Sequence, residues 1–220
     1  MARLTIDHDA PDEDGNARAR RRSIALRLDG RAWLRVEPEV FLELGVATGD
    51  EIDDARRAAV EEALARVRAR LFVVRSLAVR MQSRSEIAKK LAARDVPPDF
   101  AREAIERAAG YGYIDDEALA GQLARGMRAR GYGRRRAEQK LRSRGLAGAV
   151  ADDALAAAYG EDDETALART ALGRRPVVGD AERRRATAFL ARRGFSARAA
   201  WEAVKRAEAE ATAEPPRDGV

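Results

Sequence analysis

A repeated spacing of apolar residues and helix breakers is the feature that most constrains how this chain can fold. Five apolar positions recur at a constant offset of 50 residues: Val73, Leu77, Leu91, Val96 and Ile105 correspond to Leu123, Met127, Leu141, Leu146 and Leu155. Four of them recur again 49 residues later, as Leu172, Leu190, Phe195 and Val204. Helix-ending sequences keep the same offset, since Arg144-Gly145-Leu146 corresponds to Arg193-Gly194-Phe195. Such an offset is typical of stacked repeats, in which each unit leaves an apolar face that its neighbour covers.

The middle repeat indicates how many helices each unit contains. Its apolar residues are spaced by three and four, which is the helical period. Asp115 or Asp116 is expected to begin the first helix, and Gly131 to Gly133 to end it; the second helix stops at Gly145 and a third follows it. We therefore predict an all-α fold of three tandem three-helix repeats in an elongated, curved array, with a small N-terminal β-hairpin and helix extension.

The same reasoning gives the expected domain boundaries. We expect a disordered acidic and basic segment over 1–22, a hairpin and helical extension over 23–69, three-helix repeats over 70–113, 114–160 and 161–207, and a disordered tail over 208–220. The hairpin is predicted from alternating residues 24–28, the turn Asp29-Gly30 and a return strand from Trp33 to Val36. A helix from near Ile52 or Asp53 to about Met81 should join the extension to the first repeat.

The composition argues against several classes of activity. The chain has no Cys and one histidine, His8, so we expect no metal site, no thiol chemistry and no histidine-dependent catalysis. Phosphate-binding glycine loops are absent, and no apolar run approaches the roughly 20 residues of a membrane span. The adjacent acidic pairs, such as Asp115-Asp116, are interpreted as helix starts. We expect no enzymatic activity, no cofactor and a cytoplasmic location.

A dense run of cations is the strongest functional signal. It consists of Arg125, Arg128, Arg130, Arg134, Arg135, Arg136, Lys140, Arg142 and Arg144, with Glu138 as the only acid among them. Arginine suits phosphate and carboxylate groups through its planar fork of donors. The alternative is a solvated face in an arginine-rich chain. A weaker cluster follows one repeat later, at Arg183, Arg184, Arg185, Arg192 and Arg193, and the two could form a continuous basic strip.

Three tyrosines at expected helix junctions offer a second kind of contact. Tyr111, Tyr113 and Tyr132 could stack on bases or pack between helices. We expect Tyr113 to pack and leave both possibilities open for Tyr132. The nine cations from Arg125 to Arg144, together with Tyr132, are our predicted partner-binding surface, called the central basic surface below.

Several of these motifs together resemble the RecX family. They are Ser85-Glu86-Ile87 through Leu91, then Gly112-Tyr113-Ile114-Asp115-Asp116, then Gly131-Tyr132-Gly133 through Lys140-Leu141, and finally Arg144-Gly145-Leu146. The resemblance covers about 70–159 well and the third repeat more loosely. The chain departs from the family pattern at Lys140, where Glu is common, at Ala137, where Ile is common, and at Leu119, which replaces a frequent aromatic.

The resemblance implies a fold of tandem three-helix repeats and a defined partner. Members of this family bind filaments of the RecA recombinase on DNA and modulate ATP hydrolysis and strand exchange, usually as inhibitors, in recombination, DNA repair and the SOS response. It therefore implies RecA–single-stranded DNA as partner, contact with single- or double-stranded DNA, no membrane association and a monomer. Two other classes stay open: a general nucleic-acid-binding helical protein, expected to bind DNA tightly by itself, and an inert helical scaffold.

Overall fold

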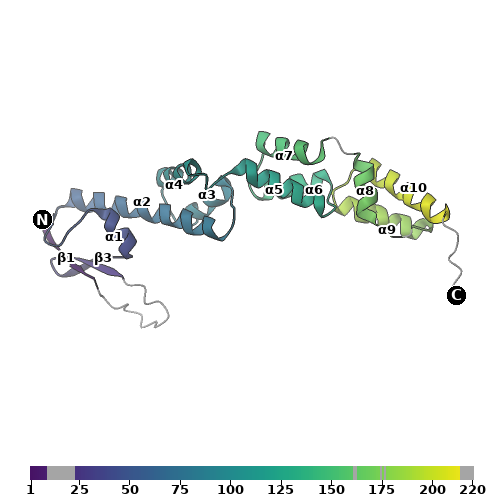
Figure 1. Ribbon diagram of the computed structural model, residues 1–220. Coiled ribbons are helices and arrows are strands. Elements are labelled where there is room, and N and C mark those ends of the chain that lie inside the picture. Colours follow the sequence, from purple (N-terminus) through teal and green to yellow (C-terminus); the bar gives the residue numbers. More distant parts are fainter. Residues whose placement is uncertain (9–22, 161–162, 174, 176, 214–220) are drawn as a thin grey trace. The chain divides into compact units, whose positions relative to one another are not determined.

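The computed structural model describes residues 1–8, 23–160, 163–173, 175 and 177–213. These residues form ten helices and four strands, in agreement with the predicted, mostly helical fold (Figure 1). The chain divides into two compact units. The first comprises Met1–Arg80 and Ala88–Tyr113, and the second comprises Met81–Ile87 and Ile114–Val220. Helix α3, Arg84–Ala92, begins in the second unit and ends in the first.

The first unit begins with a small antiparallel sheet. Its strands are β1 (Ala2–Asp7), β2 (Ile24–Leu28), β3 (Arg31–Val36) and β4 (Glu51–Ile52), in the order β3-β2-β1-β4. The predicted hairpin is confirmed as β2 and β3. Asp29 and Gly30 both have positive φ, as a two-residue hairpin turn of the favoured type requires.

The expectation that 1–22 is disordered is wrong at its start. Residues 2–7 form β1, which pairs with β2 and with β4 and buries Leu4 completely. The physical reason is that Leu4 and Ile6 alternate with polar residues and find partner strands more than 15 residues away in sequence. The remainder of that predicted segment, 9–22, lies outside the described residues.

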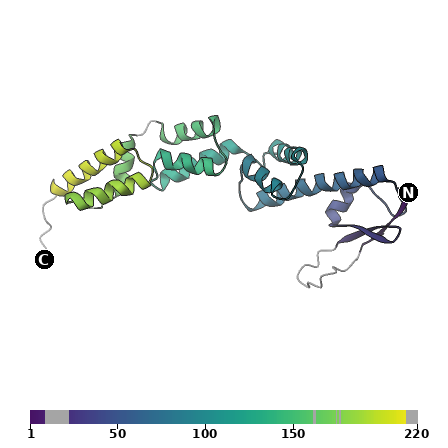
Figure 2. The same cartoon turned by 180° about the vertical axis from the view of Figure 1, so that it is seen from behind.

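The core of the first unit lies between the sheet and two helices, α1 (Pro38–Leu44) and α2 (Asp54–Val79). Leu26 of the sheet, Val40 of α1 and Val60 of α2 are all buried there. Asp53 begins α2 by accepting a hydrogen bond from the backbone N–H of Arg56 at 2.7 Å. Helix α4 (Pro98–Gly110) packs against the later part of α2, as Figure 2 shows from the opposite side.

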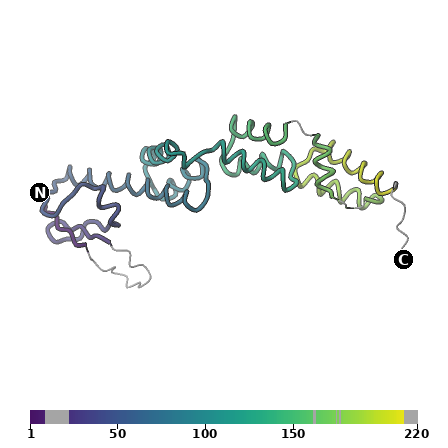
Figure 3. The backbone as a smooth tube through the Cα atoms, in the orientation of Figure 1, coloured from purple at the N-terminus to yellow at the C-terminus, as the bar shows by residue number. Residues whose placement is uncertain are grey.

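The second unit contains two sets of three helices (Figure 3). The first set is α5 (Asp116–Ala129), α6 (Arg134–Ser143) and α7 (Ala149–Tyr159), and the second is α8 (Glu164–Leu172), α9 (Gly179–Arg192) and α10 (Ala197–Ala213). The apolar positions that repeat in the sequence are the ones buried. Leu91 of α3, Leu141 of α6 and Leu190 of α9 are each 0% exposed.

The prediction of a disordered tail over 208–220 is wrong for 208–213, because α10 continues to Ala213. Acidic residues of this segment are held by cations of the two preceding helices. Glu208 pairs with Arg183 of α9 at 2.7 Å, and Glu210 accepts a hydrogen bond from Nε of Arg169 of α8 at 3.1 Å. The remainder of that segment, 214–220, lies outside the described residues.

Candidate partner-binding surface

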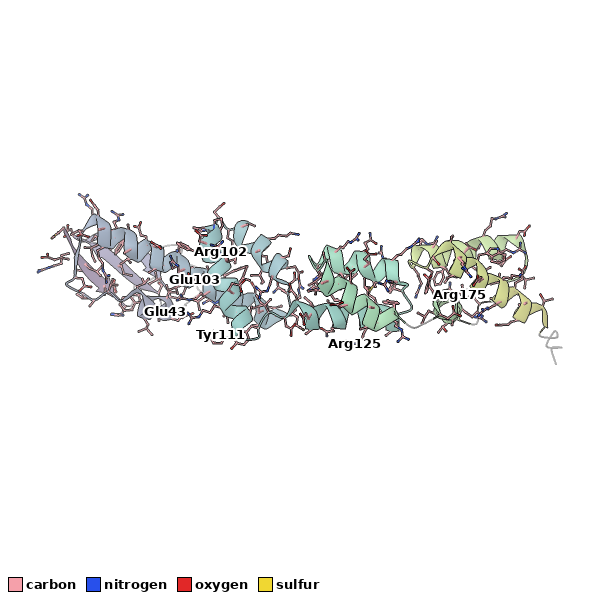
Figure 4. The ribbon with its side chains drawn as sticks, turned by 90° about the horizontal axis from the view of Figure 1, so that it is seen from above. Glu43, Arg102, Glu103, Tyr111, Arg125 and Arg175 are labelled. Atoms are coloured by element: carbon pink, nitrogen blue, oxygen red, sulfur yellow. The ribbon has the colours of Figure 1, made fainter. Side chains whose placement is uncertain are left out.

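Helices α5 and α6 present the central basic surface because their apolar residues fix which way each helix faces. In α5, Leu119, Ala120 and Ala124 are buried, which leaves Arg125 and Arg128 exposed. Arg125 is labelled in Figure 4. In α6, Ala137 and Leu141 are fully buried, so the cations of that helix are directed to solvent. Arg134, Arg135, Arg136, Lys140 and Arg142 are all exposed, as is Arg130 before the helix.

The first turn of α6 is electrostatically unusual. Gly133 occupies the N-cap position without a capping side chain, no acid lies in the first turn, and residues 134–136 are all arginine. A helix N-terminus carries a partial positive charge, so cations there are unfavourable and anions favourable. The neighbouring α5 follows the ordinary rule, since Asp115 caps it and Asp116 lies in its first turn. The start of α6 therefore places three cations at the positive end of a helix, where the Gly133 N–H already bonds to the carbonyl of Arg193.

The cations of this surface differ in how far neighbouring groups already engage them. Arg142 forms an ion pair with Glu138, and Arg136 donates a hydrogen bond to Gln139 at 2.6 Å. Among the described residues, no acid pairs with Arg134, Arg135 or Lys140. These three side chains have charge available to an external anion, and so do Arg125 and Arg130, with which no described acid pairs either.

Arg144, in contrast, is used inside the chain. Its Nε lies 2.7 Å from Oε1 of Glu86, and both side chains are 17% exposed. Its Nη2 donates to the carbonyl of Met81 at 2.9 Å, and its own carbonyl accepts from Oγ of Ser83 at 2.5 Å. Ser83 and Glu86 also form the reciprocal capping box at the start of α3. Arg144 thus links the end of α6 to the start of α3.

A similar junction occurs one repeat later, and the sequence reasoning missed it. The carbonyl of Arg193 accepts from the backbone N–H of Gly133 at 2.9 Å. Nη1 of Arg193 donates to the carbonyl of Arg130 at 2.7 Å and to that of Gly131 at 3.0 Å. The sequence feature that pointed to this junction was the constant offset of the Arg-Gly endings. That offset predicted a helix end but not the residues that the helix end contacts. Each Arg-Gly ending joins one set of helices to the preceding one.

The tyrosines take different positions. Tyr132 is half-buried, with the guanidinium of Arg193 5.1 Å from its ring centre, and its carbonyl accepts from Oη of Tyr159 at 3.0 Å. Burial raises the pKa of Tyr159 to about 12. The expectation that Tyr113 packs between helices is wrong, because 61% of it is exposed beside the ring of Tyr111.

Two cations of the second basic cluster are paired with nearby acids. Arg183 pairs with Asp180 at 3.0 Å and with Glu208 at 2.7 Å, and Arg185 lies 3.4 Å from Glu182. Arg193 is engaged in the junction described above. Within this cluster, a continuous basic strip would rest on Arg184 and Arg192, which are exposed and have no acid partner among the described residues.

The acidic pairs serve as helix starts, as predicted. Asp115 accepts from the backbone N–H of Ala118 at 2.8 Å, and Asp163 accepts from that of Thr165 at 2.9 Å. In the part of the chain that the structure describes, no three His, Cys, Asp or Glu side chains gather as metal ligands. No described helix is both long and apolar enough to cross a bilayer.

Comparison with known proteins identifies relatives of the first two predicted repeats. Residues 69–107 match the family model described as RecX, first three-helix domain, and 115–155 match RecX, second three-helix domain. A protein of Xanthomonas campestris pv. campestris (strain B100) named Regulatory protein RecX is 37% identical over 118 residues, which is 53% of this chain and 73% of the relative. One of the same name from Halorhodospira halophila is 40% identical over 128 residues, 56% of this chain and 78% of the relative.

Two solved structures share the fold. One, described as the crystal structure of regulatory protein RecX, superposes with a TM-score of 0.61 at 25% identity and covers 94% of this chain and all of the other. The second, RecX from Lactobacillus salivarius, has a TM-score of 0.54 at 19% identity and covers 67% of this chain and 97% of the other. At that identity, the second likeness concerns the fold alone.

Proposed function

The chain belongs to the RecX family of regulatory proteins, and from that premise we propose that it binds the RecA–single-stranded DNA filament and slows its ATPase and strand exchange. The observation that carries the proposal is the first turn of α6. Three arginines and no acid stand there at the positive end of a helix, and Lys140, with which no described acid pairs, follows on the same helix. Such an arrangement is unfavourable for the free chain and favourable for a bound anion.

The contact surface in this proposal is the central basic surface without Arg144. Arg134, Arg135 and Lys140 are its central residues, because they share helix α6 and their charges are exposed and unpaired among described residues. The other cations of the surface add positive charge around these three; they are Arg125, Arg128, Arg130, Arg136 and Arg142. Tyr132 lies at the edge of the surface. The anionic partner groups are phosphates of the filament's DNA or carboxylates of the recombinase, both of which suit the planar fork of arginine.

In this proposal the chain acts by binding and catalyses no reaction. It works as a monomer in the cytoplasm, with RecA as its partner. Because exposed charges are screened beyond about 10 Å at 0.1 M salt, inhibition should weaken as the salt concentration rises.

The test is RecA-catalysed ATP hydrolysis on single-stranded DNA, with and without the chain. We expect the intact chain to slow hydrolysis, and a variant with Arg134, Arg135 and Lys140 all changed to Glu to lose most of that effect while keeping its helical circular dichroism. The matched control changes Lys89, Arg184 and Arg192 to Glu. These are also exposed cations without an acid partner among described residues, so the net charge is the same.

Three results would contradict the proposal or part of it. Equal loss of inhibition in the control variant would show that total charge, and not the α6 surface, determines binding. Tight, salt-dependent DNA binding without any effect on RecA would favour the general nucleic-acid-binding protein. Neither DNA binding nor an effect on RecA would favour the inert scaffold.

A further inference from the structure

A groove of about 250 Å³ lies between α2 and α4 in the first unit and includes none of the residues of the central basic surface. Its floor is aliphatic and includes Leu71 and Val73 of α2 with Ala104 and Ala108 of α4. Glu43 and Tyr111, both labelled in Figure 4, also line it. We call it the α2–α4 groove.

The rim of this groove exposes an unusual amount of apolar surface. Tyr111 is 63% exposed, Tyr113 is 61% exposed and Val74 is 50% exposed. The two tyrosine rings lie 6.0 Å apart. Contiguous exposed apolar groups of this kind mark interaction sites more often than isolated ones do.

The tyrosines are held by the backbone and do not hang on a loose loop. Gly112 has φ +73, which turns the chain sharply after α4. Its N–H bonds to the carbonyl of Ala109 at 2.8 Å, and that of Tyr113 to the carbonyl of Ala108 at 2.9 Å. A turn of this form closes a helix C-terminus and fixes the residues on it. The backbone that carries the two rings is therefore already ordered, so binding at the rings costs little backbone entropy.

The charges around the groove are balanced except at one position. Arg70 pairs with Glu43 and lies 3.9 Å from Glu103, so its charge is already neutralised. Arg107 lies over the ring of Tyr111 at 5.9 Å, and no described acid pairs with it. Arg107 is thus a cation beside the apolar floor that can pair with one carboxylate of a ligand.

We propose that the α2–α4 groove binds a segment of a protein partner in which an aromatic or large aliphatic side chain is followed by a carboxylate. The side chain fills the aliphatic floor between the tyrosines, and the carboxylate pairs with Arg107. A nucleic acid fits this groove less well, since its phosphates need several cations and would meet Glu43 and Glu103. The contact adds to the proposed function and does not depend on it, because it lies in the other unit and involves different residues.

The experiment uses fluorescence anisotropy with the full chain and a fluorescein-labelled peptide, Gly-Ser-Leu-Phe-Asp-Glu-Gly-Ser. We expect binding that weakens at least about fivefold with Tyr111→Ala and with Arg107→Glu, since anchor residues at such sites dominate affinity. Tyr111→Phe should retain binding, because the ring is the anchor. Arg102→Glu is the matched control: it is also exposed on α4, pairs with Asp99 and does not line the groove. Thermal melts of all variants check that they fold.

Several outcomes would overturn the proposal. Equal peptide binding by Tyr111→Ala and the unchanged chain would show that the Tyr111 ring does not anchor the peptide. Equal binding of a peptide with Asn and Gln in place of Asp and Glu would show that no carboxylate pairs with Arg107. Binding of an oligothymidine that Tyr111→Ala abolishes, without peptide binding, would assign the groove to nucleic acid. A dimer lost with Tyr111→Ala in sedimentation would assign it to a second copy. Tighter peptide binding on deletion of 214–220 would assign it to the chain's own tail.

Discussion

Glycine at the end of α9 shows how a single residue determines the contact between repeats. Gly194 has φ +87, and a Cβ atom at this position would lie 2.5 Å from the backbone nitrogen of Arg136. Opposite it, a Cβ on Gly133 would lie 2.6 Å from the carbonyl oxygen of Gly194. Both contacts involve backbone atoms, which cannot move aside as the end of a flexible side chain can. The approach of the two helices therefore requires glycine on each side.

We predict that Gly194→Ala lowers the free energy of unfolding by more than Gly148→Ala does. Gly148 also has positive φ, at +62, but a Cβ there would meet nothing within 4 Å. Both variants carry the backbone strain of about 1–3 kcal/mol, and only Gly194→Ala adds the clash with α6. Urea denaturation followed by circular dichroism measures the difference. Identical losses would mean that the close approach of Gly194 to Arg136 relaxes without a penalty.

At the scale of helices and strands, the spacing of apolar residues predicted the features that depend on residues close together in the sequence. The buried faces of α6 and α9 followed from the offset that relates Leu141 to Leu190, because the helical period fixes which residues share a face. Strand β1 was missed because its partners lie far away in sequence and an acidic run follows it. For the candidate surface, exposure of the α6 cations was predictable. The internal use of Arg144 was not, since Glu86 belongs to a helix of another repeat.

The orientation of α6 gives a direct test of that helix face. We predict that Leu141→Ala lowers the free energy of unfolding by about 2–5 kcal/mol, and Arg142→Ala by roughly 0.5 kcal/mol or less. The reason is that Leu141 is 0% exposed, whereas the Arg142 side chain is 70% exposed and pairs only along the helix surface. Chemical denaturation of both variants measures the two losses of unfolding free energy. Similar midpoints for the two would show that α6 does not face the core as described.

At the scale of the whole molecule, the chain has separate cores in its two compact units. The core of the first unit joins the sheet to α1 and α2 around Leu26, and the last core joins α8 to α10 around Leu190. In proteins built from successive units, each unit and each interface contributes its own share of the stability. A destabilising substitution therefore lowers stability mainly in the unit that contains it.

We predict that Leu26→Ala lowers hydrogen-exchange protection in β1 to β3 and α2 while α8 to α10 keep theirs. Leu190→Ala should do the reverse. Both residues are 0% exposed leucines, so each variant is the control for the other. Mass spectrometry of peptic fragments after hydrogen–deuterium exchange follows both regions at once. Loss of protection throughout the chain in either variant would show a single cooperative unit.

The joint between α6 and α9 has a consequence for how such chains change over time. It is made of the Gly133 N–H, the carbonyl and side chain of Arg193 and two glycines without side chains, so it places no demand on exposed residues such as Arg134 and Arg135. Duplication of one set of helices copies the joint with it, so an added set arrives with its attachment already in place. Its outer residues are then free to diverge toward a new ligand while the attachment is inherited unchanged.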